Sequence, residues 1–170
     1  MCVTLWVPVC VVLSVCVYVS VCLSLYAYVF QCVSLSVHVY MLSLCFFVLK
    51  MSMFVYDYDH NAPNPEHLEK THERLFKILR EKQPDLPVLM ISTADQCFRE
   101  NTDARKAIIR RTWENAVAAG DKNVYFLDGQ TIYQDVGLDY CTVDGTHPND
   151  LGFWCMANAI GAEIQKIMEW

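Results

Sequence analysis

The first 49 residues of this chain contain no Asp, Glu, Lys or Arg, and every charged side chain lies from Lys50 onward. Much of this first part alternates between Val or Leu and Cys, Ser or Tyr. Such alternation is typical of β-strands, yet residues 2–49 hold no Gly, Asn or Asp to form turns between strands. The sequence therefore divides into a hydrophobic low-complexity segment, residues 1–50, and a charged segment, residues 51–170.

Residues 2–49 allow three interpretations. A charge-free apolar run longer than about 18 residues is typical of a membrane span. That interpretation gives membrane contact through residues 1–49 and a membrane-associated or extracytoplasmic location, although the location itself stays unassigned. A native strand region is the second interpretation. We favour a translated simple repeat, because GTG-TGT tracts encode Val-Cys and small slips add Ser, Leu and Tyr.

The charge and the cysteines of the chain exclude some functions. The 13 basic and 19 acidic side chains give a net charge of −6. This balance argues against a nucleic-acid partner, because such a surface needs clustered Lys and Arg. Beyond the first segment the cysteines are Cys97, Cys141 and Cys155, which lack the CxxC spacing of a metal site. We expect buried free thiols.

Strand and helix patterns alternate between residues 53 and 168. Apolar runs at 53–56, 88–92 and 123–127 predict three strands. Asn64 is expected to cap a first helix that begins at Pro65, a second helix runs from about residue 101 to Gly120, and a third runs from Asp150 to Met168. The side chains expected to face inward on these three helices are Leu68, His72, Leu75, Phe76 and Leu79; Ile108, Ile109, Trp113 and Val117; and Phe153, Met156, Ile160, Ile164 and Ile167.

This alternation predicts an α/β fold in which helices cover a parallel sheet. Three strands are too few for a complete doubly wound sheet of about five. We therefore expect an incomplete sheet whose missing strands would precede residue 50. One side of the strand at 53–56 would then be an open edge.

Polar side chains gather where strands of such a sheet end, which is where ligands bind in this architecture. In the tetrapeptide from Asp144 to His147, one tight turn can bring the carboxylate next to the imidazole. A carboxylate on one ring nitrogen leaves the other free to act as a base. Asn61 could donate its side-chain amide to a developing oxyanion. The alternatives are an ordinary Asp-Gly turn at residue 144 and an Asn61 that caps its own turn.

Three further polar residues have structural interpretations. His60 is expected to be a solvated loop residue, and His72 is expected to pack on the inner face of its helix. Ser92 ends a strand, but no glycine follows it to form a nucleophile turn. A separate hypothesis is a metal-dependent hydrolase, with ligands from the same two polar segments; its ligands would be Asp57, Asp59, His60, Asp144 and His147.

Three segments together resemble the SGNH (GDSL-like) esterase and acylhydrolase superfamily over about residues 52–168. They are residues 56–63 (YDYDHNAP), 120–129 (GDKNVYFLDG) and 143–152 (VDGTHPNDLG). The resemblance implies an incomplete flavodoxin-like three-layer α/β/α sandwich that hydrolyses a small-molecule or glycan ester without a metal or organic cofactor. It also implies that His147 is the general base, Asp144 its orienting acid and Asn61 the oxyanion donor.

The chain departs from that family at the nucleophile. The family's serine lies in a Gly-Asp-Ser-like turn after the first strand, and a second block supplies a glycine N–H to the oxyanion hole. Both blocks precede the position of Asn61, but the first glycine here is Gly120. A sharp nucleophile turn needs backbone dihedrals that glycine allows and β-branched residues disfavour. We therefore expect an impaired or inactive hydrolase; the alternative is a membrane-tethered domain without catalysis.

Overall fold

The computed structural model describes residues 50–94 and 101–169. The chain divides into two units at Met53, and every described helix and strand belongs to the second, Phe54–Trp170. The interpretations offered for residues 2–49 fall on positions outside the described residues. Within the described ranges, none of the helices combines the length and the hydrophobicity needed to cross a bilayer.

A parallel sheet forms the centre of the second unit. Its strands are β1 (Phe54–Tyr56), β2 (Val88–Ile91) and β3 (Val124–Leu127), in that order, which confirms the three predicted strands. Phe54 pairs with Val88, and Val88 pairs with Val124. All four β2 side chains are buried, because β2 has a neighbouring strand on both sides and helices above and below. In the described part of the chain, β1 pairs with β2 alone.

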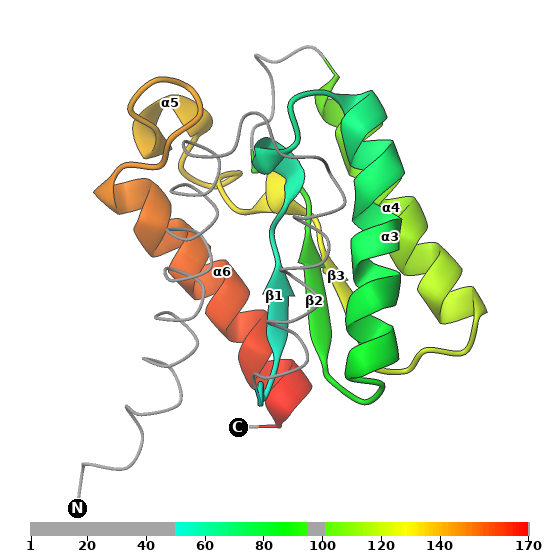
Figure 1. The fold of residues 1–170 in the computed structure, drawn as a ribbon. Coiled ribbons are helices and arrows are strands. Elements are labelled where there is room, and N and C mark those ends of the chain that lie inside the picture. Colours follow the sequence, from blue (N-terminus) through cyan, green and yellow to red (C-terminus); the bar gives the residue numbers. More distant parts are fainter. Residues whose placement is uncertain (1–49, 95–100, 170) are drawn as a thin grey trace, which may run out of the picture. The chain divides into compact units, whose positions relative to one another are not determined.

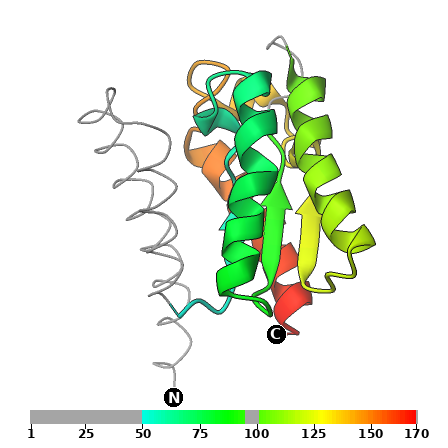
Figure 2. The ribbon, with the colours of Figure 1, turned by 45° about the vertical axis from the view of Figure 1, so that its right-hand side comes forward.

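Helices cover both faces of this sheet, which confirms the predicted α/β/α layers. Helices α3 (Pro65–Lys82) and α4 (Thr102–Ala118) lie on one face, and α6 (Asp150–Met168) lies on the other (Figures 1 and 2). Shorter elements fill the connections: η1 (Asp59–Asn61), η2 (Gly129–Thr131) and α5 (Leu138–Cys141). Parallel strands are joined by long connections that contain the helices, and these connections carry the polar segments beyond the strand ends.

The ends of α3 and α4 form as their sequences predict. The Asn64 side chain accepts the His67 N–H at 2.8 Å, so it caps α3, and Pro65 occupies the first position of that helix. Gly120 follows the end of α4 with φ of +89°, a backbone conformation that favours glycine. On α3, the predicted inner face is buried at Leu68, His72, Phe76 and Leu79 and half-buried at Leu75.

The predicted inner faces of α4 and α6 each contain one error. Val117 is 47% exposed, because α4 turns the stripe of Ile108, Thr112 and Ala116 toward the core. Phe153 is 59% exposed, because the buried side of α6 runs through Gly152 and Cys155 instead. Helical periodicity locates an apolar side of a helix, but the close approach of neighbouring backbone selects which residues reach the core. The remaining predicted residues of these two helices are buried or half-buried.

Candidate active site

Asp144 and His147 form a hydrogen-bonded pair. Oδ2 of Asp144 lies 2.7 Å from Nδ1 of His147. Oδ1 of Asp144 accepts the backbone N–H groups of Thr146 at 3.0 Å and His147 at 2.8 Å. These bonds, chiefly the one from the His147 backbone, lower the pKa of Asp144 to about 2. At neutral pH the carboxylate is therefore charged and holds the imidazole proton on Nδ1, so that Nε2 is left as an acceptor.

The loop that carries this pair is closed by backbone hydrogen bonds at both ends. Val143 donates its N–H to the carbonyl of His147 at 2.8 Å, and Thr142 forms an isolated β-bridge with Pro148. Gly145 supplies the positive φ of +80° that this tight loop requires. The side chains of His147 and Asp144 nevertheless stay 76% and 53% exposed. Nε2 of His147 thus faces solvent and has no hydrogen-bond partner in the described part of the chain.

Asn149 connects the loop to α6. Its side-chain oxygen accepts the Gly152 N–H at 3.0 Å and so caps α6, while its amide nitrogen donates to the carbonyl of Tyr140 at 2.8 Å. Its backbone N–H donates to the carbonyl of Cys141 at 2.9 Å. One asparagine therefore fixes the end of α5, the start of α6 and the loop between them.

Asn61 ends η1, directly beyond the carboxyl end of β1. It is exposed, and its backbone N–H donates to the carbonyl of Tyr58 at 3.2 Å. No hydrogen bond of its side-chain amide occurs within residues 50–94 and 101–169, so the amide does not cap its own turn there. Figure 1 shows η1 and the loop before α6 at the same end of the sheet, where the strands end.

Two residues support Asn61 through a contact that the sequence does not predict. Asp59 is fully buried, and its carboxylate accepts the Thr93 N–H at 3.0 Å and contacts Nη1 of Arg105 at 3.1 Å. Arg105 also donates to the carbonyl of Asp59 at 2.8 Å and to that of Ala62 at 3.0 Å. This buried ion pair ties η1, on both sides of Asn61, to α4 and to the end of β2. Because Asp59 and Arg105 are 46 residues apart, local pattern reading cannot detect the pair.

The other polar residues at this end of the sheet are structural. Nε2 of His60 lies 2.6 Å from Oγ1 of Thr93, so the exposed His60 is also held to the end of β2. Ser92 is buried, and its hydroxyl accepts the Gly129 N–H at 3.0 Å and contacts Asp128 at 3.4 Å. The hydroxyl of Ser92 therefore joins the ends of β2 and β3, as expected for a polar residue at a strand end.

His72 packs on the inner face of α3, as predicted. It is fully buried and its ring stacks on Tyr56, with ring centroids 4.3 Å apart. Nδ1 contacts Oγ1 of Thr112 at 2.9 Å, and this hydroxyl in turn donates to the carbonyl of Ile108. Burial lowers the pKa of His72 to about 4, so the ring is neutral at physiological pH.

The described residues contain no group of three His, Cys, Asp or Glu side chains that could hold a metal ion. Of the ligands in the metal hypothesis, Asp59 is engaged by Arg105 and Thr93, and Asp144 by His147. Cys141 and Cys155 are buried free cysteines, as predicted, whereas Cys97 lies outside the described residues.

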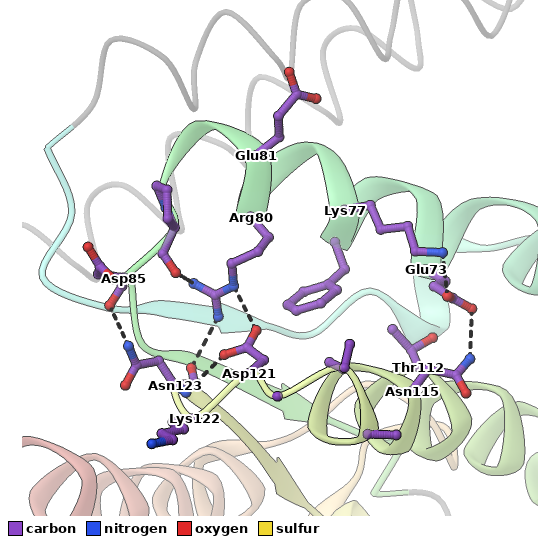
Figure 3. A pocket seen from close by; sticks show the side chains of 16 residues that line it. Glu73, Lys77, Arg80, Glu81, Asp85, Thr112, Asn115, Asp121, Lys122 and Asn123 are labelled. Carbon is purple, nitrogen blue, oxygen red and sulfur yellow. Dashed lines mark hydrogen bonds and ion pairs between the residues drawn. The ribbon is translucent and has the colours of Figure 1, made fainter.

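A hollow of about 950 Å³ lies elsewhere, between α3 and α4 (Figure 3). Four of its charged lining residues form ion pairs with one another: Arg80 pairs with Asp121 at 2.8 Å, and Glu73 pairs with Lys77 at 2.7 Å. Arg80 also donates to the carbonyls of Gln83, Pro84, Leu86 and Asn123. Leu86 and Asn123 lie just before β2 and β3, so the hollow sits where the strands begin, at the opposite end of the sheet from Asn61 and His147. Arg80 therefore has a structural role at that end.

Comparison with known proteins identifies the family and agrees with the α/β fold. The model of the GDSL-like lipase/acylhydrolase family matches residues 45–165. The chain belongs to this family. A crystal structure from Bacteroides ovatus, described as a GDSL-like lipase, is 29% identical with a TM-score of 0.65, and the match covers 76% of this chain and 39% of that one. No curated protein matches.

A more distant structure shows the same fold. The salicylyl-acyltransferase SsfX3 from a tetracycline biosynthetic pathway is 17% identical with a TM-score of 0.59, and the match covers 75% of this chain and 41% of that one. The aligned part of this GDSL-like chain thus spans about two fifths of the length of either solved structure. Its α/β fold and family are established by these matches.

Proposed function

We propose that this chain carries the proton-handling half of an ester hydrolase, directed at a small-molecule or glycan ester. The hydrogen bond of 2.7 Å between Asp144 and His147 is the observation that supports this function best. Membership of the GDSL-like family gives the reaction class, and the exposed Nε2 gives a base that a substrate can reach. No metal or organic cofactor is part of the proposal.

Each site residue has a separate role in the proposed reaction. His147 removes a proton from the attacking group through Nε2 and later returns it to the leaving alcohol. Asp144 fixes the tautomer of His147 and stabilises the imidazolium that forms. Asn61 donates its amide to the oxyanion, and the buried Asp59–Arg105 pair keeps the backbone around it in place.

We further propose that the chain has little or no esterase turnover of the serine type. Such turnover needs a serine at a glycine-containing turn, and no glycine precedes Gly120. Loss of one oxyanion donor costs about 100-fold to 1,000-fold in rate. Loss of the nucleophile as well leaves the residual catalysis that a general base and binding can provide.

Two experiments on the purified full chain test these statements. A serine-directed phosphonate probe is expected to leave the chain unlabelled, and stoichiometric labelling would show that an active serine exists. Residual hydrolysis of an activated aryl ester is expected to depend on His147, because its Nε2 is oriented and free. His147→Gln should abolish this residual ester hydrolysis, while His67→Gln, at another solvent-accessible histidine, should preserve it. Equal rates in both variants would contradict the assigned base.

The charge-free first segment motivates a second candidate function, that of a membrane-tethered domain without turnover. Membrane contact would occur through residues 1–49 and would place the domain at a membrane or outside the cytoplasm. Flotation of the full chain with neutral phosphatidylcholine vesicles tests this candidate. A chain that stays at the bottom of the gradient in monodisperse form would rule it out.

A further inference from the structure

Two buried cysteines lie at either end of the loop that carries Asp144 and His147. Cys141 is the last residue of α5, and Cys155 lies in the second turn of α6. Their exposed fractions are 0% and 7%, and both thiols are free. Helices α5 and α6, which carry the two cysteines, pack against each other. The ester-hydrolysis proposal uses neither cysteine.

The backbone around the two cysteines enforces this proximity. A Cβ on Gly152 would lie only 2.1 Å from the carbonyl oxygen of Cys141, so α6 approaches α5 as closely as a glycine allows. The same carbonyl accepts the Asn149 N–H at 2.9 Å. Cys155 is three residues after Gly152 and therefore lies on the same side of α6, toward Cys141. Both buried thiols therefore lie at the contact between α5 and α6.

We propose that Cys141 and Cys155 form a redox-modification site, at which a low-molecular-weight disulfide of the glutathione type converts the two thiols into an intramolecular disulfide. The Cys155 thiolate, the more exposed of the two, attacks the oxidant, forms a mixed disulfide and releases one thiolate. The Cys141 thiolate then attacks Sγ of Cys155, the mixed disulfide bond breaks, and the second small thiolate leaves. Two protein thiols are oxidised, and one small disulfide is reduced to two thiols.

The disulfide would close a ring around the proposed base. Residues 142–149, which hold Asp144 and His147, lie between the two cysteines, so the bond would tie together the elements at both ends of that loop. Burial, with a further contribution from Cys155, raises the pKa of the Cys141 thiol. The second exchange step needs the thiolate of Cys141, so ring closure is expected to accelerate with rising pH.

The sequence provides a direct assay of this bond. Lys122 and Lys166 are consecutive tryptic cleavage sites, and the peptide between them, residues 123–166, contains Cys141 and Cys155 and no other cysteine. The native full chain is incubated with oxidised glutathione, blocked with an alkylating reagent under denaturing conditions and digested. We expect this peptide to lose two hydrogens and to carry no alkyl group. Alkylation of both cysteines, or a stable glutathione adduct on either, would overturn the proposal.

A matched variant separates specific closure from general oxidation. In Cys141→Ser the resolving thiol is absent, so the same peptide should retain glutathione on Cys155. If this variant also shows no adduct while the parent closes, then Cys155 is not the residue that meets the oxidant, and the proposed order of steps is wrong. If the parent peptide closes only after the chain is unfolded in urea, the native arrangement does not form the site.

Discussion

Replacing Arg105 with alanine is expected to destabilise this domain more than any change to a surface ion pair. Asp59 is fully buried, and the Arg105 side chain is only 17% exposed. Arg105→Ala removes its hydrogen bonds to the Asp59 carboxylate and to the carbonyls of Asp59 and Ala62. Among the described residues, the variant leaves the buried carboxylate with one hydrogen bond, from the Thr93 N–H.

The size of the effect follows from that burial. Removing one partner of a buried ion pair costs roughly 3–5 kcal/mol, because the other charge stays away from water. We expect about 3 kcal/mol for Arg105→Ala, at the lower end, since the guanidinium itself is partly solvated. The total free energy of unfolding of a domain is about 5–15 kcal/mol, so the loss is a large share of it.

Arg111 provides the matched control on the same helix. Its side chain and that of its partner Glu69 are 50% and 52% exposed, so Arg111→Ala should cost about 0–1 kcal/mol. Both changes replace arginine with alanine inside α4, and the effect on helix propensity therefore cancels. Arg105→Lys keeps the charge but loses the planar fork and should give an intermediate loss, which is measurable even where the alanine variant does not fold.

Urea unfolding followed by tryptophan fluorescence measures these differences. Trp113 is half-buried and lies 5.8 Å from the Phe126 ring, so its emission reports on the contact between α4 and β3. Equal midpoints for Arg105→Ala and Arg111→Ala would refute the reasoning. Such a result would mean that the Asp59 carboxylate is solvated and that η1 is not held by this pair.

Four further outcomes are expected. The pKa of buried His72, lowered from 6.5 to about 4, means that the unfolded chain binds the proton first as the pH falls. The contribution of neutral His72 to the free energy of unfolding is therefore fully present above about pH 6.5, and about 3 kcal/mol of it is lost by about pH 4. His72→Phe should remove that part of the pH dependence in urea titrations. Gly129→Ala should abolish folding, as seen by circular dichroism, because its Cβ would lie 1.8 Å from the Ser92 carbonyl oxygen. Gly161→Ala, inside α6 with no atom within 4 Å of the new Cβ, should raise the free energy of unfolding by about 0.5–1 kcal/mol. Asp144→Ala should accelerate amide hydrogen exchange at residues 146 and 147, whose N–H groups it binds.

The fold was predictable where the determining pattern is local. Apolar runs located all three strands, and Asn64 with Pro65 located the start of α3. Val117 and Phe153 were placed incorrectly because the core-facing stripe depends on which neighbour approaches most closely. That choice is a property of tertiary packing, and periodicity alone carries no information about it.

The same distinction separates the two halves of the candidate site. The contact between Asp144 and His147 spans three residues, so the sequence of one turn is enough to predict it. The support of Asn61 spans 46 residues, from Asp59 to Arg105, and no spacing rule identifies those partners. Asp59 appeared in the sequence as a candidate metal ligand, whereas the structure shows it as the buried anchor of η1.

The local origin of the Asp144–His147 pair supports the proposal that this chain keeps a base without a nucleophile turn. The hydrogen bonds that form the pair lie within residues 142–149 and the first turn of α6, and in the described part of the chain none involves β1. A nucleophile turn, in contrast, depends on glycines placed beside a strand of the sheet. Substitutions in residues 1–50 can therefore remove a nucleophile turn without changing the geometry of the Asp144–His147 pair. Ester hydrolysis would then depend on whether an acyl acceptor other than that serine, such as water, can be activated at the exposed Nε2 of His147.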